Sequence, residues 1–223
     1  MKRIFILAVI MAMVLGFSLQ AHATLYNQGT DSLGNRLIYD SDLDITWYDY
    51  TQTSDSWQNQ VNWASALDVN FSGTHYTDWR LPTIVDGPYS YGYNGTTTGG
   101  FNITSGEMGH LFYTELGNKG WYDTFGQLTG CSSGVQGCLT NKGIFQKLQP
   151  TVYWSGTEYA AYSNFAWAFS TGGGDQGSTD KDNRNYALAV HPGDVANVPE
   201  PGTLLLLGSG LGGLAVLRRK FKN

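Results

Sequence analysis

An apolar segment at each end of the chain limits which part can fold in water. Residues 4–17 carry no charge and follow two basic residues, Lys2 and Arg3. Residues 202–217 are also uncharged, and a basic group follows them. The 175 residues between these ends, 24–198, have the size of a single domain. We therefore expect one folded domain, with a separate role for each end of the chain.

The N-terminal segment has the three parts of a secretory signal peptide. A basic start leads into the apolar run, and Ala21-His22-Ala23 then supplies small residues on both sides of one larger residue. This pattern predicts a signal peptide over residues 1–23, with cleavage after Ala23. The domain that follows is expected to be exported.

The domain is strongly acidic. Residues 24–198 hold seven of the 13 Lys and Arg and 17 of the 18 Asp and Glu, a formal net charge of −10 against −5 for the whole chain. A negative surface repels phosphate backbones, so this charge disfavours nucleic acid as a partner. It suits solubility outside a cell, calcium or neutral glycans.

Two cysteines, Cys131 and Cys138, lie seven residues apart in a stretch rich in Gly and Ser. In an exported protein this spacing predicts a small disulfide-closed loop. The alternative is a pair of unpaired thiols.

The C-terminal segment combines Pro-Glu-Pro, a short apolar run and a basic end. Sixteen helical residues span only about 24 Å, against about 30 Å for the hydrocarbon core of a membrane. Residues 199–223 resemble the PEP-CTERM sorting signal of exopolysaccharide-producing Gram-negative bacteria. The residues that carry this resemblance are Pro199, Glu200, Pro201, Arg218 and Arg219.

The resemblance to PEP-CTERM implies an exosortase, a membrane protease, as a partner. It also implies release or transfer to the cell surface or extracellular matrix, after transient anchoring in the inner membrane by a hydrophobic helix over residues 202–217. An ordinary, permanent C-terminal anchor is the alternative. In both cases the basic end stays in the cytoplasm.

Residue periodicity predicts an α+β domain in which short strands predominate. One helix is expected from Asp55, with Gln58 completing a capping box, and a second over residues 104–117, with Thr104 and Glu107 in the same roles. Strands bounded by turn residues are predicted over residues 36–39, 44–47, 151–155, 164–170 and 186–191. The last two strands are expected to form a hairpin joined by a long polar loop.

Three motifs occur in a recognisable order: Asp78-Trp-Arg-Leu-Pro-Thr83, Tyr153-Trp-Ser-Gly-Thr157 and a last one over residues 186–194. They resemble the Lcl C-terminal domain family over about residues 39–194. That resemblance implies a C-type-lectin-like domain of short antiparallel strands with two helices, and glycan binding as in the adhesins of that family. His191 stands where an arginine is usual, so any ion pair made there is in doubt at neutral pH.

Exposed polar residues of the predicted loop and the turn before it are the candidates for ligand binding. Amides, carboxylates and tyrosine rings suit the hydroxyl groups and apolar faces of sugars. The candidates are Tyr159, Tyr162, Asp175, Asp180, Lys181, Asp182, Asn183, Arg184 and Asn185. A solvated loop without a ligand is the alternative.

The tryptophan motifs are assigned to structure. A tryptophan beside Leu-Pro is ordinarily buried, and an arginine fork can bridge backbone carbonyls or a carboxylate. The residues concerned are Trp79, Arg80, Leu81, Pro82 and Trp154.

Alternating acids at Asp40, Asp42 and Asp44 imitate the first half of an EF-hand calcium loop. The imitation fails because Ile45 stands where glycine must turn and Thr51 where a bidentate glutamate is required. We therefore expect no metal and no other cofactor, with calcium as the alternative.

No nucleophile elbow, zinc motif or phosphate-binding loop occurs in the sequence. The sequence therefore predicts no catalytic residue and a non-enzymatic, secreted, surface-sorted protein that binds polysaccharide or a biofilm matrix component. One alternative is an exported hydrolase acting on exopolysaccharide, which requires paired carboxylates. Another is a structural surface protein without a small ligand.

Overall fold

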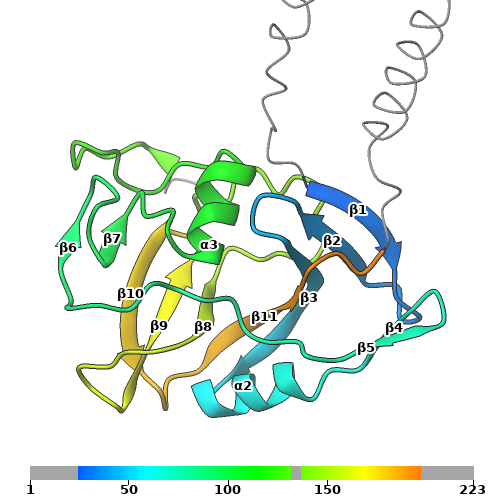
Figure 1. Cartoon of the computed structure of the whole chain (residues 1–223). Helices are drawn as coiled ribbons and strands as arrows, with labels where there is room; N and C mark the ends of the chain where they lie inside the picture. Colours follow the sequence, from blue (N-terminus) through cyan, green and yellow to red (C-terminus); the bar gives the residue numbers. More distant parts are fainter. Residues whose placement is uncertain (1–24, 132–136, 197–223) are drawn as a thin grey trace, which may run out of the picture.

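A computed structural model describes residues 25–131 and 137–196, so the predicted signal peptide and the hydrophobic segment 202–217 lie outside the described residues. The described part is mostly sheet with two short helical regions, which confirms the predicted α+β class (Figure 1). In chain order the elements are β1 (Leu25–Thr30), β2 (Arg36–Asp40), β3 (Ile45–Asp55), α2 (Trp57–Ser65), β4 (Val69–Phe71), β5 (Thr74–Tyr76), β6 (Tyr91–Gly92), β7 (Gly99–Phe101), α3 (Glu107–Gly109), the π-helix η1 (His110–Glu115), β8 (Val152–Glu158), β9 (Phe165–Ser170), β10 (Asp175–Asp180) and β11 (Asn185–Pro192).

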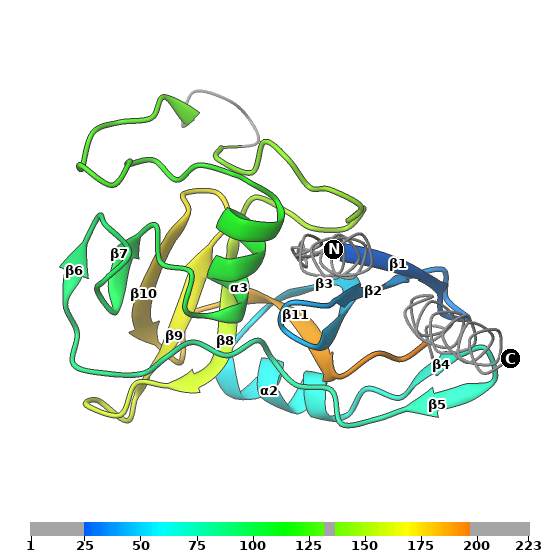
Figure 2. The ribbon, with the colours of Figure 1, turned by 45° about the horizontal axis from the view of Figure 1, so that its top comes forward.

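The strand that comes last in the sequence, β11, lies inside the main sheet. The order of strands in that sheet is β1-β2-β3-β11-β8-β9-β10-β7-β6, while β4 and β5 form a separate ribbon. β11 pairs antiparallel with β3 and parallel with β8, so it joins the early strands to the late ones (Figure 2). The expectation of antiparallel strands throughout is wrong for β8–β11 and for β6–β7, which are both parallel.

Residues 175–180 form strand β10, not part of a long polar loop. β10 pairs antiparallel with β9, from Asp175 opposite Ser170 to Asp180 opposite Phe165. The expected hairpin between residues 164–170 and 186–191 is therefore wrong. Polar side chains can occupy this strand because Gln176, although buried, donates a hydrogen bond to the Thr98 carbonyl (2.8 Å).

Two clusters of buried apolar side chains lie on the two faces of the sheet. Alternation along β9 places Trp167 and Phe169 in one cluster, which includes side chains of η1. It places Ala166 and Ala168 in the other, together with residues of α2. Trp79 and Trp154 are both buried in this second cluster.

The helix starts differ from the predicted capping boxes. Ser56 is the N-cap of α2, and Asp55 accepts a hydrogen bond from the Ser56 amide instead of capping the helix (2.8 Å). The Gln58 amide donates to Asn62, one turn further along, because both side chains lie on the exposed side of α2. The first predicted capping box is therefore wrong.

The second capping box is replaced by an ion pair. Both terminal nitrogens of Arg80 donate to the Glu107 carboxylate, at 2.7 and 2.8 Å, and the backbone amide of Thr83 donates to it as well (2.7 Å). The N-cap of α3 is Gly106, which makes no side-chain cap bond. This bidentate pair fastens the Trp79-Arg80 segment to the helix.

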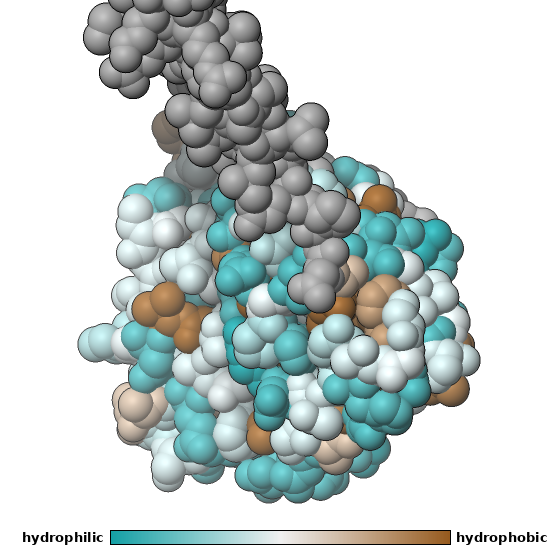
Figure 3. All heavy atoms as spheres, turned by 45° about the vertical axis from the view of Figure 1, so that its right-hand side comes forward, coloured by the Kyte–Doolittle hydropathy of each residue, from teal (hydrophilic) through white to brown (hydrophobic). Residues whose placement is uncertain are grey.

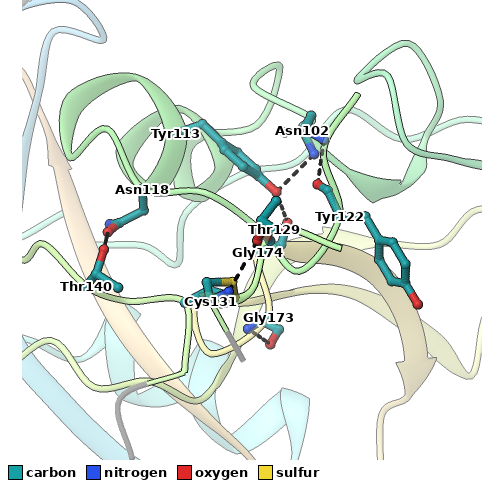
Figure 4. The surroundings of a disulfide bond; sticks show 12 residues. Asn102, Tyr113, Asn118, Tyr122, Thr129, Cys131, Thr140, Gly173 and Gly174 are labelled. Atoms are coloured by element: carbon teal, nitrogen blue, oxygen red, sulfur yellow. Dashed lines mark hydrogen bonds between the residues drawn. A yellow bond between two sulfur atoms is a disulfide. The ribbon is translucent and has the colours of Figure 1, made fainter. Parts of the chain in front are cut away.

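An irregular segment connects η1 to β8 and lies beside one end of the sheet (Figure 2). Cys131 and Cys138 form a disulfide within it, as the sequence predicts. Around the disulfide, the Tyr113 hydroxyl donates to the Gly174 carbonyl and accepts from the Asn102 amide (Figure 4). Further along the segment, two successive backbone amides donate hydrogen bonds to the carboxylate of Asp49, a buried residue of strand β3. Strand β3 therefore also holds this segment in place.

The face seen in Figure 3 is mostly hydrophilic, with apolar residues in small separate groups. Across residues 25–131 and 137–196, no helix has the length and apolar character needed to cross a membrane.

Replacing Glu107 with glutamine tests the ion pair. Glu107→Gln leaves the Arg80 charge without its partner in a site where the Glu107 side chain is only 13% exposed. We expect the free energy of unfolding to fall by roughly 2 to 3 kcal/mol, somewhat less than for a fully buried pair. Urea unfolding measures the change. The control Glu158→Gln removes an exposed partner of Lys181 and should cost less than about 1 kcal/mol; equal losses would contradict the structural role of Glu107.

Removing the disulfide tests how the irregular segment is held. A double Cys131→Ser, Cys138→Ser variant should be less stable by about 2 to 3 kcal/mol. The disulfide closes a loop and so lowers the chain entropy of the unfolded state, and the variant lacks this restriction. Thermal unfolding with and without a reductant checks this. The reductant should lower the melting temperature of the native chain and leave that of the variant unchanged.

Candidate functional site

The predicted binding residues do not form one site, because the sheet separates them. Tyr159 and Tyr162 line an aromatic groove, whereas Asp175 and Asn185 line a polar groove. Ser178 lies opposite Trp167 in the β9–β10 pairing, and Gly177 lies opposite Ala168. Residues opposite each other share a face and neighbours in sequence do not, so the aromatic groove lies on the Trp167 face and the polar groove on the Ala168 face of this pair of strands, with Ser178 bordering both.

The other candidates lie around the turn after β10 and bond to nearby protein groups. Lys181 is 2.9 Å from Glu158, donates to the Ser163 carbonyl, and lies 4.4 Å from the centre of the Trp57 ring. Arg184 donates to the Ser54 carbonyl. Bonds within the turn and to β10 involve Asp180, Asp182 and Asn183. The turn thus packs against the start of α2, which reduces the freedom of these side chains to meet a ligand.

The aromatic groove consists of two adjoining hollows that share Tyr89, Tyr159 and Tyr162. One, of about 620 Å³, lies between residues 86–89 and the turn over residues 159–162, and the other, of about 320 Å³, extends to Ser178 on β10. Asp86 joins its two sides, since one carboxylate oxygen accepts from the Trp167 indole (2.7 Å) and the other from the Ala160 amide (3.4 Å). The Tyr89 amide donates to the Tyr159 hydroxyl (3.3 Å). Hydrogen bonds therefore hold both walls of the groove.

Exposed tyrosines stand on a buried aromatic base in this groove. Trp167 and Tyr159 are almost fully buried, while Tyr89 is 47% and Tyr162 is 62% exposed. Tyr89 stacks on Trp167, with ring centres 6.0 Å apart, and Tyr162 lies 5.7 Å from Tyr159. A Cβ atom on Gly99 would come within 2.9 Å of the Tyr89 ring, so the glycine gives that ring its room. The result is a rigid aromatic surface open to solvent.

Sequence reasoning missed Asp86 and Tyr89, which belong to a segment without strong helix or strand periodicity. The signal that could have found the tyrosine is the alternation of Tyr89, Tyr91 and Tyr93, each more than a third exposed. Tyr93 stacks on the buried Phe101 ring, with centres 6.0 Å apart. These three tyrosines extend the exposed aromatic character beyond the groove along β6.

The polar groove opens where β9 and β10 carry small residues, Ala168 and Gly177. Burial raises the pKa of the Asp175 carboxyl, although a hydrogen bond from Ser170 opposes that shift. The Asn185 side-chain nitrogen is buried and has no hydrogen-bond partner within the described structure. This groove therefore has a carboxyl group and several hydroxyl groups in its lining, from Asp175 and from Ser and Thr residues of β9 and β10.

The fold and the grooves define the class as a disulfide-containing, mostly β domain with an open aromatic site. Residues 197–220 match the PEP-CTERM protein-sorting motif, which confirms the predicted sorting signal. This motif is the recognition signal of exosortase, so the chain is directed to export and membrane-associated sorting in a Gram-negative bacterium. No match was found among curated proteins or among solved structures.

His191 occupies an aromatic environment where the Lcl resemblance expects an arginine. Its ring lies 5.5 Å from Tyr76 and 5.3 Å from Trp79, and its buried Nδ1 has no partner in the described structure. Burial lowers the pKa of His191, against the opposing effects of a backbone hydrogen bond to Pro192 and of the Asp78 charge. The imidazole is therefore neutral at pH 7.

The lowered pKa of His191 predicts a stability that depends on pH. As pH falls below about 6.5, the unfolded state takes up the proton more readily than the folded state, so the free energy of unfolding decreases. His191→Phe keeps a flat ring and should flatten this slope in urea titrations between pH 5 and pH 7, taken as roughly the range in which histidine titrates. The exposed control His75→Gln should keep it. An unchanged slope in His191→Phe would show that another group is responsible.

Proposed function

We propose that the domain is a non-enzymatic, surface-sorted module that binds extracellular polysaccharide through the aromatic groove. The observation that carries this proposal is the pair of exposed tyrosines, Tyr89 and Tyr162, fixed on a buried aromatic base beside Asp86. Sugar rings present apolar faces edged by hydroxyl groups, and tyrosine offers a flat apolar ring with a polar tip. A rigid surface of this kind binds with little loss of side-chain entropy.

The domain's net charge supports a neutral sugar as the ligand. Residues 24–198 carry a formal charge of −10, which disfavours strongly anionic polymers. The sorting signal supports the same proposal, because it directs the chain out of the cytoplasm to where extracellular polysaccharide is found. A matrix component of the producing cell's own biofilm is therefore the ligand class that we propose.

The C-type-lectin-like character of the domain is a proposal that rests on the sequence resemblance, and the arrangement of strands is compatible with it. β11 pairs antiparallel with β3, which precedes the first helix, so late and early strands meet in one sheet. β8, β9 and β10 follow the helices and form an antiparallel group beside β11. Of the binding candidates suggested with this resemblance, Tyr159 and Tyr162 belong to the turn that forms one wall of the aromatic groove.

The groove's acids favour binding over hydrolysis. Glycoside hydrolysis uses two carboxyl groups about 5 to 10 Å apart on either side of the scissile bond. Asp86 is the single carboxylate in the lining of the aromatic groove, and its oxygens face the Trp167 indole and the Ala160 amide. Asp175, the carboxyl group of the polar groove, lies on the opposite face of the strands.

A binding assay with neutral polysaccharides tests the proposed function. The full chain, purified in a mild detergent, is titrated with exopolysaccharide oligomers while the same mixtures are assayed for new reducing ends. We expect saturable binding without new reducing ends, and Tyr162→Ala should weaken it by about fivefold or more, since a stacked ring contributes about 1 kcal/mol. Tyr26→Ala removes a similarly exposed tyrosine from β1 and is the matched control, which should bind as the native chain does.

Three outcomes would contradict the proposal. New reducing ends would favour an exported hydrolase. Absence of binding to every polymer tested would favour a structural surface protein. Equal loss in Tyr162→Ala and Tyr26→Ala would remove the aromatic groove as the binding surface.

A further inference from the structure

Three side chains of types that bind metals, Asp40, His110 and Glu115, lie close together away from both grooves, where the end of β2 meets η1, and Asp42 lies beside His110. The His110 Nε2 atom lies 3.1 Å from a carboxylate oxygen of Asp42 and 3.3 Å from one of Glu115. Asp40, His110 and Glu115 each offer one ligand atom, and these three atoms all lie within 4.8 Å of one another. Asp40, Asp42, His110 and Glu115 are called the histidine–carboxylate cluster below.

The π-helix explains why two of these groups meet. His110 and Glu115 are five residues apart at the two ends of η1. In an α-helix of 3.6 residues per turn, positions five apart point in different directions. The wider π-helical turn brings them onto one side, and π-helical turns are frequent at functional sites.

The turn between β2 and β3 supplies the other two carboxylates. One oxygen of the fully buried Asp40 accepts bonds from the backbone amides of Asp42 and Leu43, and the other accepts from the Trp47 indole (3.2 Å). Asp44 is not part of the cluster, since its carboxylate accepts from the Tyr39 hydroxyl (2.9 Å). Of the three alternating acids, Asp40 and Asp42 therefore lie near His110 and Asp44 does not, and the three do not form an EF-hand loop.

The protein's own hydrogen bonds leave negative charge in the cluster unbalanced. Nε2 of an imidazole carries at most one hydrogen, which can point at Asp42 or at Glu115 but not at both. Even a protonated histidine offers one positive charge against three carboxylates. The Glu115 side chain is only 3% exposed, so water does little to screen its carboxylate. Among the described residues, the ion pairs of lysine and arginine involve other acids.

We propose that the histidine–carboxylate cluster binds one divalent first-row transition-metal ion, with Zn²⁺ as the reference ion. Zn²⁺ binds imidazole nitrogen and carboxylate oxygen at about 2.0 to 2.2 Å, which puts tetrahedral ligand atoms about 3.3 to 3.6 Å apart. The separations of 3.1 and 3.3 Å around Nε2 are close to that range. The ligand atom of Asp40 lies within 4.8 Å of the other two, so a side-chain adjustment of about 1 Å, larger than for the pairs around Nε2, would bring it to the same ion.

The donor set selects among ions. An imidazole nitrogen with carboxylates suits zinc and its first-row neighbours, whereas calcium takes six to eight oxygen ligands. The ion would reach the site through Asp42, the most exposed member, whose side chain is 45% accessible. Bound there, it would join the β2–β3 turn to η1 and so stabilise the domain.

Metal binding by the full chain tests the proposal. The chain, purified in a mild detergent and stripped with a chelator, is titrated with Zn²⁺ by calorimetry, and the bound metal is counted after dialysis. We expect one Zn²⁺ per chain and a rise in melting temperature on binding. His110→Gln should weaken Zn²⁺ binding at least tenfold and abolish that rise.

Two further variants keep the test independent of misfolding. Asp42→Asn changes the exposed ligand, which should leave the fold intact and still weaken Zn²⁺ binding at least threefold. His75→Gln removes the other close histidine–carboxylate pair, formed with the exposed Asp68, and should leave Zn²⁺ binding unchanged. Absence of Zn²⁺ binding by the native chain would overturn the proposal. So would full Zn²⁺ binding by a folded His110→Gln chain.

Discussion

The pairing of β11 with both β3 and β8 is the interaction on which the rest of the domain depends. It brings together residues 45–55, 152–158 and 185–192, which are far apart in the chain. The segment with Trp79 attaches to the same strand, through two backbone hydrogen bonds between Arg80 and Val190. Pairings of such sequence separation have a high entropic cost of closure, so folding is expected to be slow relative to a helical protein of equal size.

The sheet also determines which functional side chains can contact the same ligand. The aromatic groove and the polar groove share strand β10 but face opposite ways, so one ligand of ordinary size contacts a single groove. The histidine–carboxylate cluster uses the turn after β2 and the helix η1, and none of its four residues lines either groove. The proposed sugar site and the proposed metal site are therefore separable by mutation.

Much of the sheet could be predicted from local pattern, because β9 alternates large and small apolar residues and β11 has a run of buried apolar residues at its centre. Strand β10 could not, since its residues are polar or glycine and only the pairing with β9 makes it a strand. The capping boxes failed for a related reason. The Glu107 carboxylate has a stronger partner in Arg80, 27 residues earlier, which no local rule considers.

The candidate site was predictable in part. Tyr159 and Tyr162 were identified from composition, but their partner Tyr89 lies 70 residues earlier than Tyr159 and is brought to them by the fold. Asp40 and Asp42 were considered for calcium on spacing alone. Their meeting with His110 depends on a π-helical turn, and the sequence contains no recognised signal for one.

The end of the described domain has a consequence for how the chain is presented to its processing enzyme. Val195 is buried, and the Tyr76 hydroxyl donates to its carbonyl, only two residues before the matched sorting motif begins at residue 197. The predicted hydrophobic segment begins at residue 202, seven residues after Val195, and at about 3.3 to 3.6 Å per residue this connection reaches at most about 25 Å. While that segment is in the membrane, the folded domain therefore stays within about that distance of the bilayer, and a protease acting on the motif from the exported side must work in the space between them.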